Sequence, residues 1–401
     1  MNYEMTQHIK DFAFQIGADM VGIANIERFS GAPIMMSPQG IMPHAKTVIV
    51  CAVHHPDAAI ELGGEPEPQD IGPYSIQYIM NDRLDMLSYR IAHELDKEGY
   101  DAIPIASSNI WRYRSYKELD AVFAPDMSHI YAAVAAGLTE LGWNGLSISP
   151  EYGARNRFIS IITDADLEPT PLYHDEKLCD MCGECIRNCP TDAYRQEVNG
   201  VKNVVIEGKD HKFANKNLWR CAWGEHFDLD LNLEIPPVVT EDVIAKAVKE
   251  HGIRGGEFGV CLRVCLPKHL RVKDPAYTRV YRRKRHSVAT DLPMHRGVLD
   301  RAAAQAARWN IDYCCQISAG TLEKAGIDVK KYLPDGVSVL LLADEYKLAK
   351  NANAGDYIRI AGFNLHFCAY DIVRDWEYLG YTAMSQSAID CKALAAAIGL
   401  E

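Results

Sequence analysis

The spacing of four cysteines constrains this chain more than any other feature of its sequence. The segment LCDMCGECIRNCP, residues 178–190, places Cys179, Cys182, Cys185 and Cys189 in the pattern C-x2-C-x2-C-x3-C-P. Thiolates are soft ligands, and two-residue gaps let one loop wrap three corners of a tetranuclear iron–sulfur cluster. A structural zinc site normally uses two separated C-x2-C pairs instead. The run therefore predicts an iron–sulfur cluster, with metal ligation holding the surrounding loops.

A second cysteine group follows, in the segments WRCAWGEHF (219–227) and GVCLRVCLP (259–267). In two-cluster ferredoxins, the last cysteine of the first run binds the other cluster. The two-cluster pattern therefore predicts four ligands for the first cluster and only three for the second. The first set is Cys179, Cys182, Cys185 and Cys265, and the second is Cys189, Cys221 and Cys261.

One ligand of the second cluster is missing from this pattern. Phe258 stands three residues before Cys261, where a C-x2-C-x3-C repeat would have its first cysteine. Three explanations stay open. In the first, another residue is the fourth ligand of the second cluster. In the second, that cluster is a [3Fe-4S] cluster, and in the third it is a [4Fe-4S] cluster with an open iron site. The candidates for a substitute ligand are Cys314, Cys315, Glu257 and His251.

Composition sets outer limits on function. The chain has 401 residues, enough for about two or three domains, and a formal net charge of −12 that does not suggest a nucleic-acid partner. The basic hexapeptide YRRKRH (281–286) is predicted to be a solvated loop or helix end. The first 20 residues resemble neither a signal peptide nor a twin-arginine leader, and no run of roughly 18 apolar residues occurs. We expect a cytoplasmic protein without a membrane span, in which twelve cysteines indicate metal binding rather than a disulfide framework. Cys51, Cys368 and Cys391 lie in apolar runs and are expected to be simply buried.

Residues 1–169 read as alternating helices and strands. A helix is predicted over residues 5–17, and the apolar run TVIVCAV (47–53) predicts a strand buried on both faces. A long helix over 78–98 is predicted to end at Gly99, and HIYAAVAAGLTELG (129–142) to form another. This pattern indicates a layered α/β domain, an α+β sandwich.

Two further segments follow the first domain. Residues 170–275 are rich in cysteine and turns, and predict the iron–sulfur domain. Residues 290–401 read as a degenerate internal repeat of the first domain. LPDGVSVLLLA (333–343) resembles MPHAKTVIVCA (42–52), and AYDIVRDWEYLGYTAM (369–384) resembles SYRIAHELDKEGYDAI (88–103). AARWNIDYCCQIS likewise resembles AFQIGADMVGIAN, while WNGLSISPEYGARNRF has no counterpart in the second copy.

The segment from His129 to Pro171, followed by the cysteine run, resembles the cobalamin-dependent reductases. This family comprises the reductive dehalogenases and the epoxyqueuosine reductases. The shared elements are an AAGL helix, SPEYG, TD-x-x-LEP and the C-x2-C-x2-C-x3-CP run, and the resemblance extends over about residues 5–270. It implies a nitroreductase-like domain that binds a corrinoid, cobalamin, fused to a two-cluster ferredoxin-like domain. Electrons would pass through the clusters to cobalt, with Co(I) the reactive species.

The resemblance also implies roles for individual residues. Arg157 matches an arginine after the PEYG motif, Asn109 a loop asparagine, and Tyr78 or Tyr74 a tyrosine acid. Such an arginine stabilises negative charge developing during reductive cleavage, and the tyrosine donates a proton. Structural alternatives stay open: an ion pair from Arg157 to Glu151 or the cofactor, packing for the tyrosines, and loop ordering for Asn109. The corrinoid-binding positions implied are Tyr74, Asn144, Gly145, Ser149, Pro150, Glu151, Tyr152 and Gly153.

Departures from the family narrow the expected activity. The chain lacks the D-x-x-P-V-x-E stretch of the epoxyqueuosine branch, which favours the dehalogenase branch. It also lacks D-x-H-x-x-G, which favours a corrinoid without a protein cobalt ligand. We expect an oxygen-sensitive reductase acting on a small organic substrate, with an external electron donor such as a ferredoxin or flavodoxin. The alternatives are a flavin-dependent (FMN) nitroreductase-like enzyme and a non-catalytic electron-transfer partner.

Overall fold

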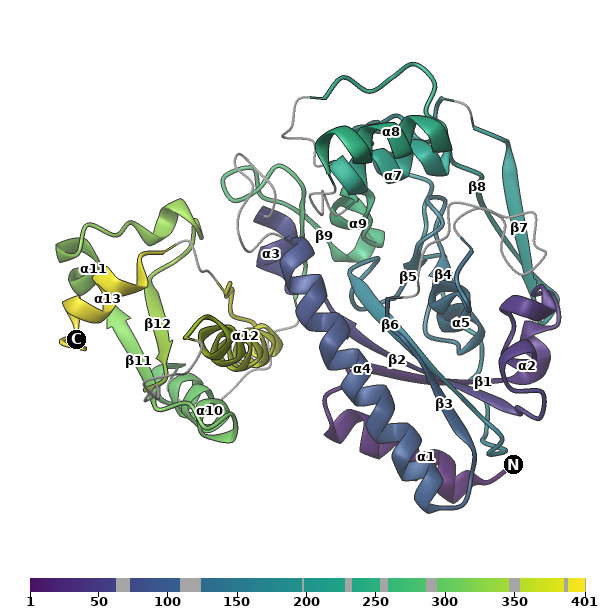
Figure 1. Ribbon diagram of the computed structural model, residues 1–401, viewed down its shortest axis with the longest axis horizontal. Helices are drawn as coiled ribbons and strands as arrows, with labels where there is room; N and C mark the ends of the chain where they lie inside the picture. Colours follow the sequence, from purple (N-terminus) through teal and green to yellow (C-terminus); the bar gives the residue numbers. More distant parts are fainter. Residues whose placement is uncertain are drawn as a thin grey trace. The chain divides into compact units, whose positions relative to one another are not determined.

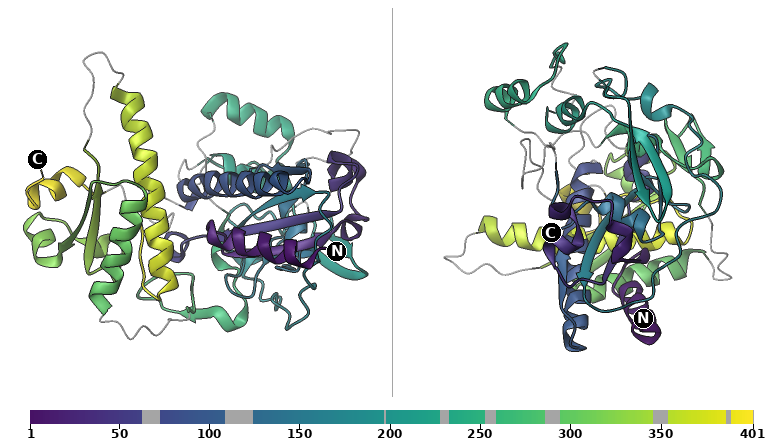
Figure 2. Two further views of the ribbon diagram at one scale, coloured as in Figure 1. Left: turned by 90° about the horizontal axis from the view of Figure 1, so that it is seen from below. Right: turned by 90° about the vertical axis from the view of Figure 1, so that its right-hand side faces the viewer.

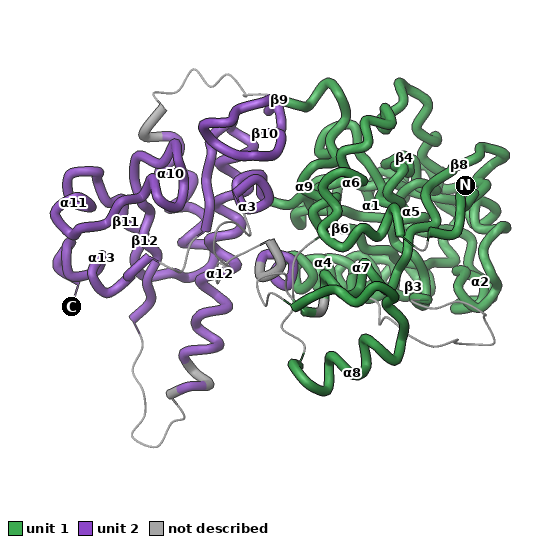
Figure 3. Tube along the Cα trace, turned by 90° about the horizontal axis from the view of Figure 1, so that it is seen from above, with its two compact units in different colours: residues 1–55, 80–271 green, residues 56–79, 272–401 purple. Residues whose placement is uncertain are grey.

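The chain divides into two compact units, which we describe separately (Figure 3). The first comprises residues 1–55 and 80–271, and the second residues 56–79 and 272–401. The computed structural model describes residues 1–62, 73–108, 124–196, 198–227, 233–252, 259–285, 294–345, 354–385 and 389–400. None of the helices within these ranges carries a stretch long and apolar enough to cross a membrane.

A four-stranded antiparallel sheet forms the centre of the first unit. Its strand order is β1-β2-β6-β3, and every neighbouring pair is antiparallel. All eight residues of β2 are buried, which confirms the strand buried on both faces that the apolar run predicted. The bounds are β1 Met20–Asn25, β2 Thr47–His54, β3 Ala102–Ile105 and β6 Asn156–Thr163.

Helices cover both faces of this sheet (Figure 1). On one face α1 (Tyr3–Gln15) and α4 (Pro73–Lys97) lie side by side, joined by a 3.0 Å contact from His8 to Glu94. On the other face α5 (His129–Ala135) packs against strand residues such as Val48 and Val50. The layered α/β prediction is therefore confirmed.

The helix predicted over residues 129–142 is too long. α5 stops at Ala135, and Gly137 follows in the left-handed region with φ +74°. A Cβ atom at Gly137 would lie 2.1 Å from the Pro171 carbonyl oxygen, so the chain turns there and continues as a strand. The short strands are β4 (Glu140–Leu141) and β5 (Ser147–Ile148).

The cysteine-rich segment packs into the first unit, so the predicted boundary at residues 169 and 170 does not separate compact units. The hairpin of β7 (Val201–Ile206) and β8 (Lys209–Ala214) places Ile206 and Phe213 in the apolar core beside α5. The remaining helices of the first unit, which Figure 2 shows from two further directions, are short apart from α7 and α8. They are α6 Glu184–Arg187, α7 Leu218–Phe227, α8 Glu241–His251 and α9 Val260–Val264; α2 is Pro38–Ile41.

The second unit contains a two-stranded antiparallel sheet of β11 (Tyr313–Ser318) and β12 (Ser338–Ala343). One face packs against α10 and α12, where Cys314 and Leu342 contact the cluster around Ala306 and Cys368. The other face packs against α11 and α13 through Ile317 and Leu341. Its helices are α3 Asp57–Leu62, α10 Met294–Arg308, α11 Ala319–Lys324, α12 Ala354–Tyr378 and α13 Cys391–Ala397; a separate hairpin joins β9 (Arg271–Lys273) to β10 (Tyr281–Arg283).

The second unit shares element order and register with the start of the chain, which supports the proposed internal repeat. A helix, two antiparallel strands and a helix follow one another in both regions. α4 and α12 each have 25 residues, and each is followed by a left-handed glycine, Gly99 and Gly380. The end pairs of the strands are Met20 with Ala52 and Asn25 with Thr47 in the first unit, and Tyr313 with Ala343 and Ser318 with Ser338 in the second.

The basic hexapeptide is not a solvated loop, because two of its arginines bind buried carboxylates. Asp57 in α3 is fully buried, and the Arg283 guanidinium donates to it from 2.8 Å while that of Arg285 donates from 3.1 Å. Glu377 of α12, also buried, accepts the Asp57 amide at 2.7 Å. The arginines therefore join three segments of the second unit, and the prediction of solvent exposure was wrong. A smaller expectation also failed, since Cys391 is exposed whereas Cys51 and Cys368 are buried.

Replacing Arg283 with methionine should destabilise the second unit. The substitution keeps much of the side-chain length but leaves Asp57 with one arginine, and breaking a buried ion pair costs about 3–5 kcal/mol. Lys284→Met, at the exposed neighbouring position, should change the free energy of unfolding by no more than about 0.5 kcal/mol. Denaturant titration of both variants measures the difference, and equal stabilities would contradict the structural role of Arg283.

Candidate functional site

Four cysteines line one cavity in the first unit, and they are the four predicted for the first cluster. These are Cys179, Cys182, Cys185 and Cys265. Left-handed backbone at Met181 and Gly183, with φ +57° and +74°, wraps the loop so that its thiols face inward. The Trp143 amide donates a 3.4 Å hydrogen bond to the Cys179 sulfur.

A neighbouring cavity collects the other three predicted cysteines, Cys189, Cys221 and Cys261. Cys185 lines both cavities, so the two thiol groups lie next to each other. The Ala193 amide donates a 3.4 Å hydrogen bond to the Cys189 sulfur. The two cavities thus bring together the seven predicted cysteines, and their division between two clusters stays a prediction.

The polar groups around these cavities fit iron–sulfur clusters. Asn144 is buried, and its Nδ2 has no hydrogen-bond partner among the described atoms, although the residue lines the first cavity. Cluster thiolates and sulfides would accept such hydrogen bonds. Lys216 is partly buried, with Nζ donating to the Asn144 carbonyl at 3.2 Å and to the Tyr194 hydroxyl at 3.4 Å. Burial lowers the pKa of Lys216, but the Cys221 and Cys261 sulfurs outweigh this and raise it.

The structure limits the candidates for the missing ligand. Phe258 and Glu257 lie outside the described residues, and His251, which is exposed at the end of α8, is not among the residues that line the second cavity. Cys314 and Cys315 belong to β11 of the second unit, where Cys314 packs against α10 and α12. Among the described residues that line the second cavity, Glu225 is the one with a charged side chain.

The SPEYG turn lies directly against the segment that carries Cys265. Gly153 has φ +63°, and a Cβ atom there would lie 2.7 Å from the Cys265 carbonyl oxygen. The Ala154 amide donates to that same oxygen at 3.0 Å, and the Pro150 carbonyl accepts from His269 at 2.9 Å. The predicted corrinoid-binding turn and the predicted first cluster are therefore immediate neighbours.

The other predicted corrinoid-binding residues are mostly engaged within this turn. Ser149 is fully buried, and its hydroxyl accepts from the Tyr152 amide at 3.0 Å. The Tyr152 ring stacks on His54, with 4.5 Å between ring centroids. Gly145, with φ +78°, sits in the turn between β4 and β5, and Glu151 is exposed. Ser149 and Gly145 thus shape the loop, whichever molecule it binds.

Arg157 lies at the second position of β6, opposite Val53 of β2. Its Nε donates to the Asn81 side-chain oxygen at 2.7 Å, and its Nη2 to the Ser107 carbonyl at 3.3 Å. Burial raises the pKa of Glu225 to about 7, and the charges of Arg157 and Lys216 oppose that rise. The Arg157 charge therefore acts on a residue that lines the second cavity.

The other predicted catalytic residues are less well defined. Asn109 and the side chain of Tyr74 lie outside the described residues, with Tyr74 in the first turn of α4. Tyr78 is 59% exposed in the second turn of that helix and belongs to the second unit. Its assignment as a proton donor stays a prediction.

Sequence reasoning missed four polar residues of this region: Lys216, Glu225, Tyr194 and Asn81. Two of them carried a local signal. Lys216 precedes Cys221 by five residues, and Glu225 follows it by four, one helical turn further along α7. Asn81 and Tyr194 reach the site only through the tertiary fold, so spacing along the chain could not indicate them.

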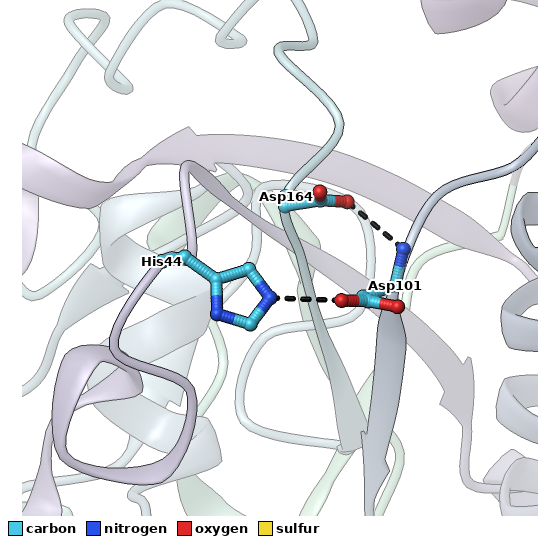
Figure 4. A group of neighbouring side chains, drawn as sticks. All are labelled: His44, Asp101 and Asp164. Atoms are coloured by element: carbon cyan, nitrogen blue, oxygen red, sulfur yellow. Dashed lines mark hydrogen bonds and ion pairs between the residues drawn. The ribbon is translucent and has the colours of Figure 1, made fainter.

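A separate group of potential metal ligands lies at the surface. His44, Asp101 and Asp164 have ligand atoms within 4.8 Å of one another (Figure 4). His44 contacts the Asp101 carboxylate at 2.9 Å, and Asp164 accepts the Asp101 amide at 2.9 Å. These hydrogen bonds, which hold the ends of β3 and β6, account for the cluster without a metal ion.

Comparison with known proteins supports the iron–sulfur interpretation. Residues 172–195 match the family model described as a 4Fe-4S binding domain. A tetrachloroethene reductive dehalogenase of Desulfitobacterium hafniense is 31% identical over 139 residues, 34% of this chain and 21% of that protein. An epoxyqueuosine reductase of Leadbetterella byssophila is 27% identical over 244 residues, 52% of this chain and 71% of that protein. The predicted resemblance is confirmed.

Both branches of these reductases match, so the preference for the dehalogenase branch stays a prediction. The match spans about a fifth of the length of the first dehalogenase relatives. Among solved structures, a catabolic reductive dehalogenase matches at TM-score 0.40 and 19% identity, covering 56% of this chain and 29% of its own. The epoxyqueuosine reductase of Streptococcus thermophilus matches at TM-score 0.38 and 20% identity, covering 66% of this chain and 65% of its own. Structural likenesses of this size carry no argument, and the nitroreductase-like detail stays a prediction.

Gly153→Ala should loosen the first cluster site. The added Cβ would meet the Cys265 carbonyl oxygen and the Leu266 side chain at 2.7 and 2.8 Å, so the segment carrying Cys265 must shift. Gly200→Ala is the matched control, because Gly200 has a similar φ of +72° but open space around it. We expect about 1–3 kcal/mol of additional destabilisation and faster iron loss in Gly153→Ala than in the control. Equal rates of iron release to a chelator would contradict this.

His55 should make the first unit sensitive to acid. It is fully buried, and burial, reinforced by the nearby Arg157 charge, lowers its pKa from 6.5 to about 3. The unfolded chain therefore takes up this proton below pH 6.5 while the folded chain does not, and stability is lost as pH falls from 6.5 toward 3. The loss is up to about 1.4 kcal/mol per pH unit.

The variant His55→Gln tests this contribution. Its unfolding free energy should fall less steeply over that pH range than that of the unaltered protein. His174→Gln, at an exposed position, is the control. Denaturant titrations at several pH values provide the slopes, and an unchanged slope for His55→Gln would refute the assignment.

Proposed function

We propose that the protein is an iron–sulfur reductase that uses two clusters and a corrinoid to cleave a bond in a small organic substrate. The observation that carries this proposal is the sorting of seven cysteines into two adjacent cavities, with the SPEYG turn against the Cys265 segment. Clusters that lie this close to a cofactor loop provide a short electron path. The relatives are reductases, which supports the reaction class.

The cysteines would bind two clusters, each with its own set of ligands. Cys179, Cys182, Cys185 and Cys265 would hold the first cluster, and Cys189, Cys221 and Cys261 the second. Lys216, which interacts electrostatically with Cys185, Cys189, Cys221 and Cys261, places a positive charge close to where each reduced cluster would gain negative charge. It should therefore raise the reduction potentials of the clusters.

The remaining proposed roles concern the corrinoid and the substrate. When bound, the corrinoid would supply a strongly reducing centre with an open coordination position. The turn containing Pro150, Tyr152 and Gly153 would hold it. The Arg157 guanidinium, oriented by Asn81 and Ser107, would stabilise negative charge on the leaving group, and Tyr78 is the proposed proton donor.

Two alternatives deserve direct comparison. A flavin in place of the corrinoid would make the protein an FMN-dependent reductase, and loss of the cofactor site would leave an electron-transfer protein. The partner is equally open, since one epoxyqueuosine reductase of known structure holds a tRNA stem loop. The net charge of −12 favours a small-molecule substrate and an external ferredoxin or flavodoxin, as the sequence predicted.

Anaerobic reconstitution with iron, sulfide and cobalamin tests the proposal. We expect corrinoid bands in the ultraviolet-visible spectrum, together with cobalt, iron and sulfide in the purified protein. Arg157→Gln should lower turnover of a halogenated or epoxide substrate by roughly 100-fold while retaining both clusters. Arg90→Gln, at an exposed position of α4, is the matched control. Intact clusters without corrinoid binding would refute the proposal, and flavin fluorescence in the extract would favour the FMN alternative.

A further inference from the structure

The second cavity is lined by a carboxylate, Glu225, as well as by the three cysteines assigned to the second cluster and by Cys185, which it shares with the first cavity. Cys221 and Glu225 both line this cavity, and they lie one turn apart on α7. Residues four apart on a helix present their side chains on one face. Glu225 therefore reaches the cavity from the same face of α7 as Cys221, and its side chain is longer.

The other polar side chains that line this cavity already have partners. The Tyr194 hydroxyl donates to the Asn144 carbonyl at 3.3 Å and accepts from Lys216 at 3.4 Å. The Thr191 hydroxyl lies 3.7 Å from the Cys189 sulfur. Glu225, by contrast, makes neither a hydrogen bond nor an ion pair with any residue in the described part of the chain.

Glu225 is half-buried and lacks a hydrogen bond within the described part of the chain, and the nearby charges of Arg157 and Lys216 offset its burial only in part. Carboxylates largely withdrawn from water in proteins are paired with cations or coordinate metal ions. Iron accepts carboxylate oxygen as well as thiolate sulfur, as in the iron sites built from two histidines and a carboxylate. Coordination would therefore satisfy both the incomplete cluster and the unpartnered side chain.

We propose that the Glu225 carboxylate binds the fourth iron of the second cluster, replacing the cysteine that is absent at Phe258. This inference rests on the proposed cluster assignment of Cys189, Cys221 and Cys261. A carboxylate is a harder and weaker donor to iron than a thiolate. The iron bound by Glu225 is therefore the one that the second cluster loses most readily, and the cluster keeps this iron only while the carboxylate is present.

The experiment uses the full chain, reconstituted anaerobically, with Glu225→Gln and Glu225→Cys as variants and exposed Glu234→Gln as control. Unaltered protein and control should hold about eight iron atoms per chain. Glu225→Gln, which keeps the side-chain shape, should lose about one iron and show the paramagnetic resonance signal of an oxidised [3Fe-4S] cluster. Glu225→Cys should keep the full iron content and shift the potential of the second cluster downward.

The outcomes separate this inference from the proposed function. Absence of any cluster in the unaltered protein would overturn both. An intact first cluster beside a trinuclear second cluster in the unaltered protein would overturn the inference alone, as would a full iron content in Glu225→Gln. If circular dichroism shows that Glu225→Gln does not fold, the Glu225→Cys variant provides the test. A reduction potential of the second cluster equal to that of the unaltered protein would then overturn the inference.

Discussion

The hydrogen bond from the Ala154 amide to the Cys265 carbonyl joins the central sheet of the first unit to its cysteine-rich segment. Gly153 makes that contact possible, because a side chain there would meet the same carbonyl at 2.7 Å. β6 begins two residues after Ala154 and carries Arg157. One backbone contact therefore positions a predicted cluster ligand, the SPEYG turn and the predicted catalytic arginine relative to one another.

The charges around the two thiol-lined cavities form a connected group. Lys216 is partly buried and interacts electrostatically with sulfurs of both groups, and Lys216 and Arg157 both act on Glu225, which lines the second cavity. Partly buried charges of this kind are costly unless they compensate one another or a bound group. Reduced iron–sulfur clusters carry negative charge, so the positive side chains suit sites that accept electrons.

The second unit shows how a duplicated pattern can acquire different contacts. Its strands pair in the same register as β1 and β2, but it contains no described counterpart of β6, which carries Arg157 in the first unit. Ion pairs from the buried Asp57 carboxylate to Arg283, in β10, and to Arg285, two residues beyond it, hold α3 in this unit. The region thus keeps the scaffold of the proposed repeat without the chemistry that the first unit carries.

The amino-acid sequence by itself predicted the division of the seven cysteines, the buried strand β2 and the family resemblance. These features depend on the spacing of residues that are close together in the sequence, and this spacing does not depend on the tertiary structure. The sequence did not reveal that Arg283 and Arg285 pair with the buried Asp57, or that Asn81 orients Arg157, because these partners lie far away in the chain. Only the tertiary structure placed Glu225 in the cavity of Cys189, Cys221 and Cys261. Helical spacing aligns Glu225 with Cys221, but convergence with Cys189 and Cys261 requires the loops to fold around a common centre.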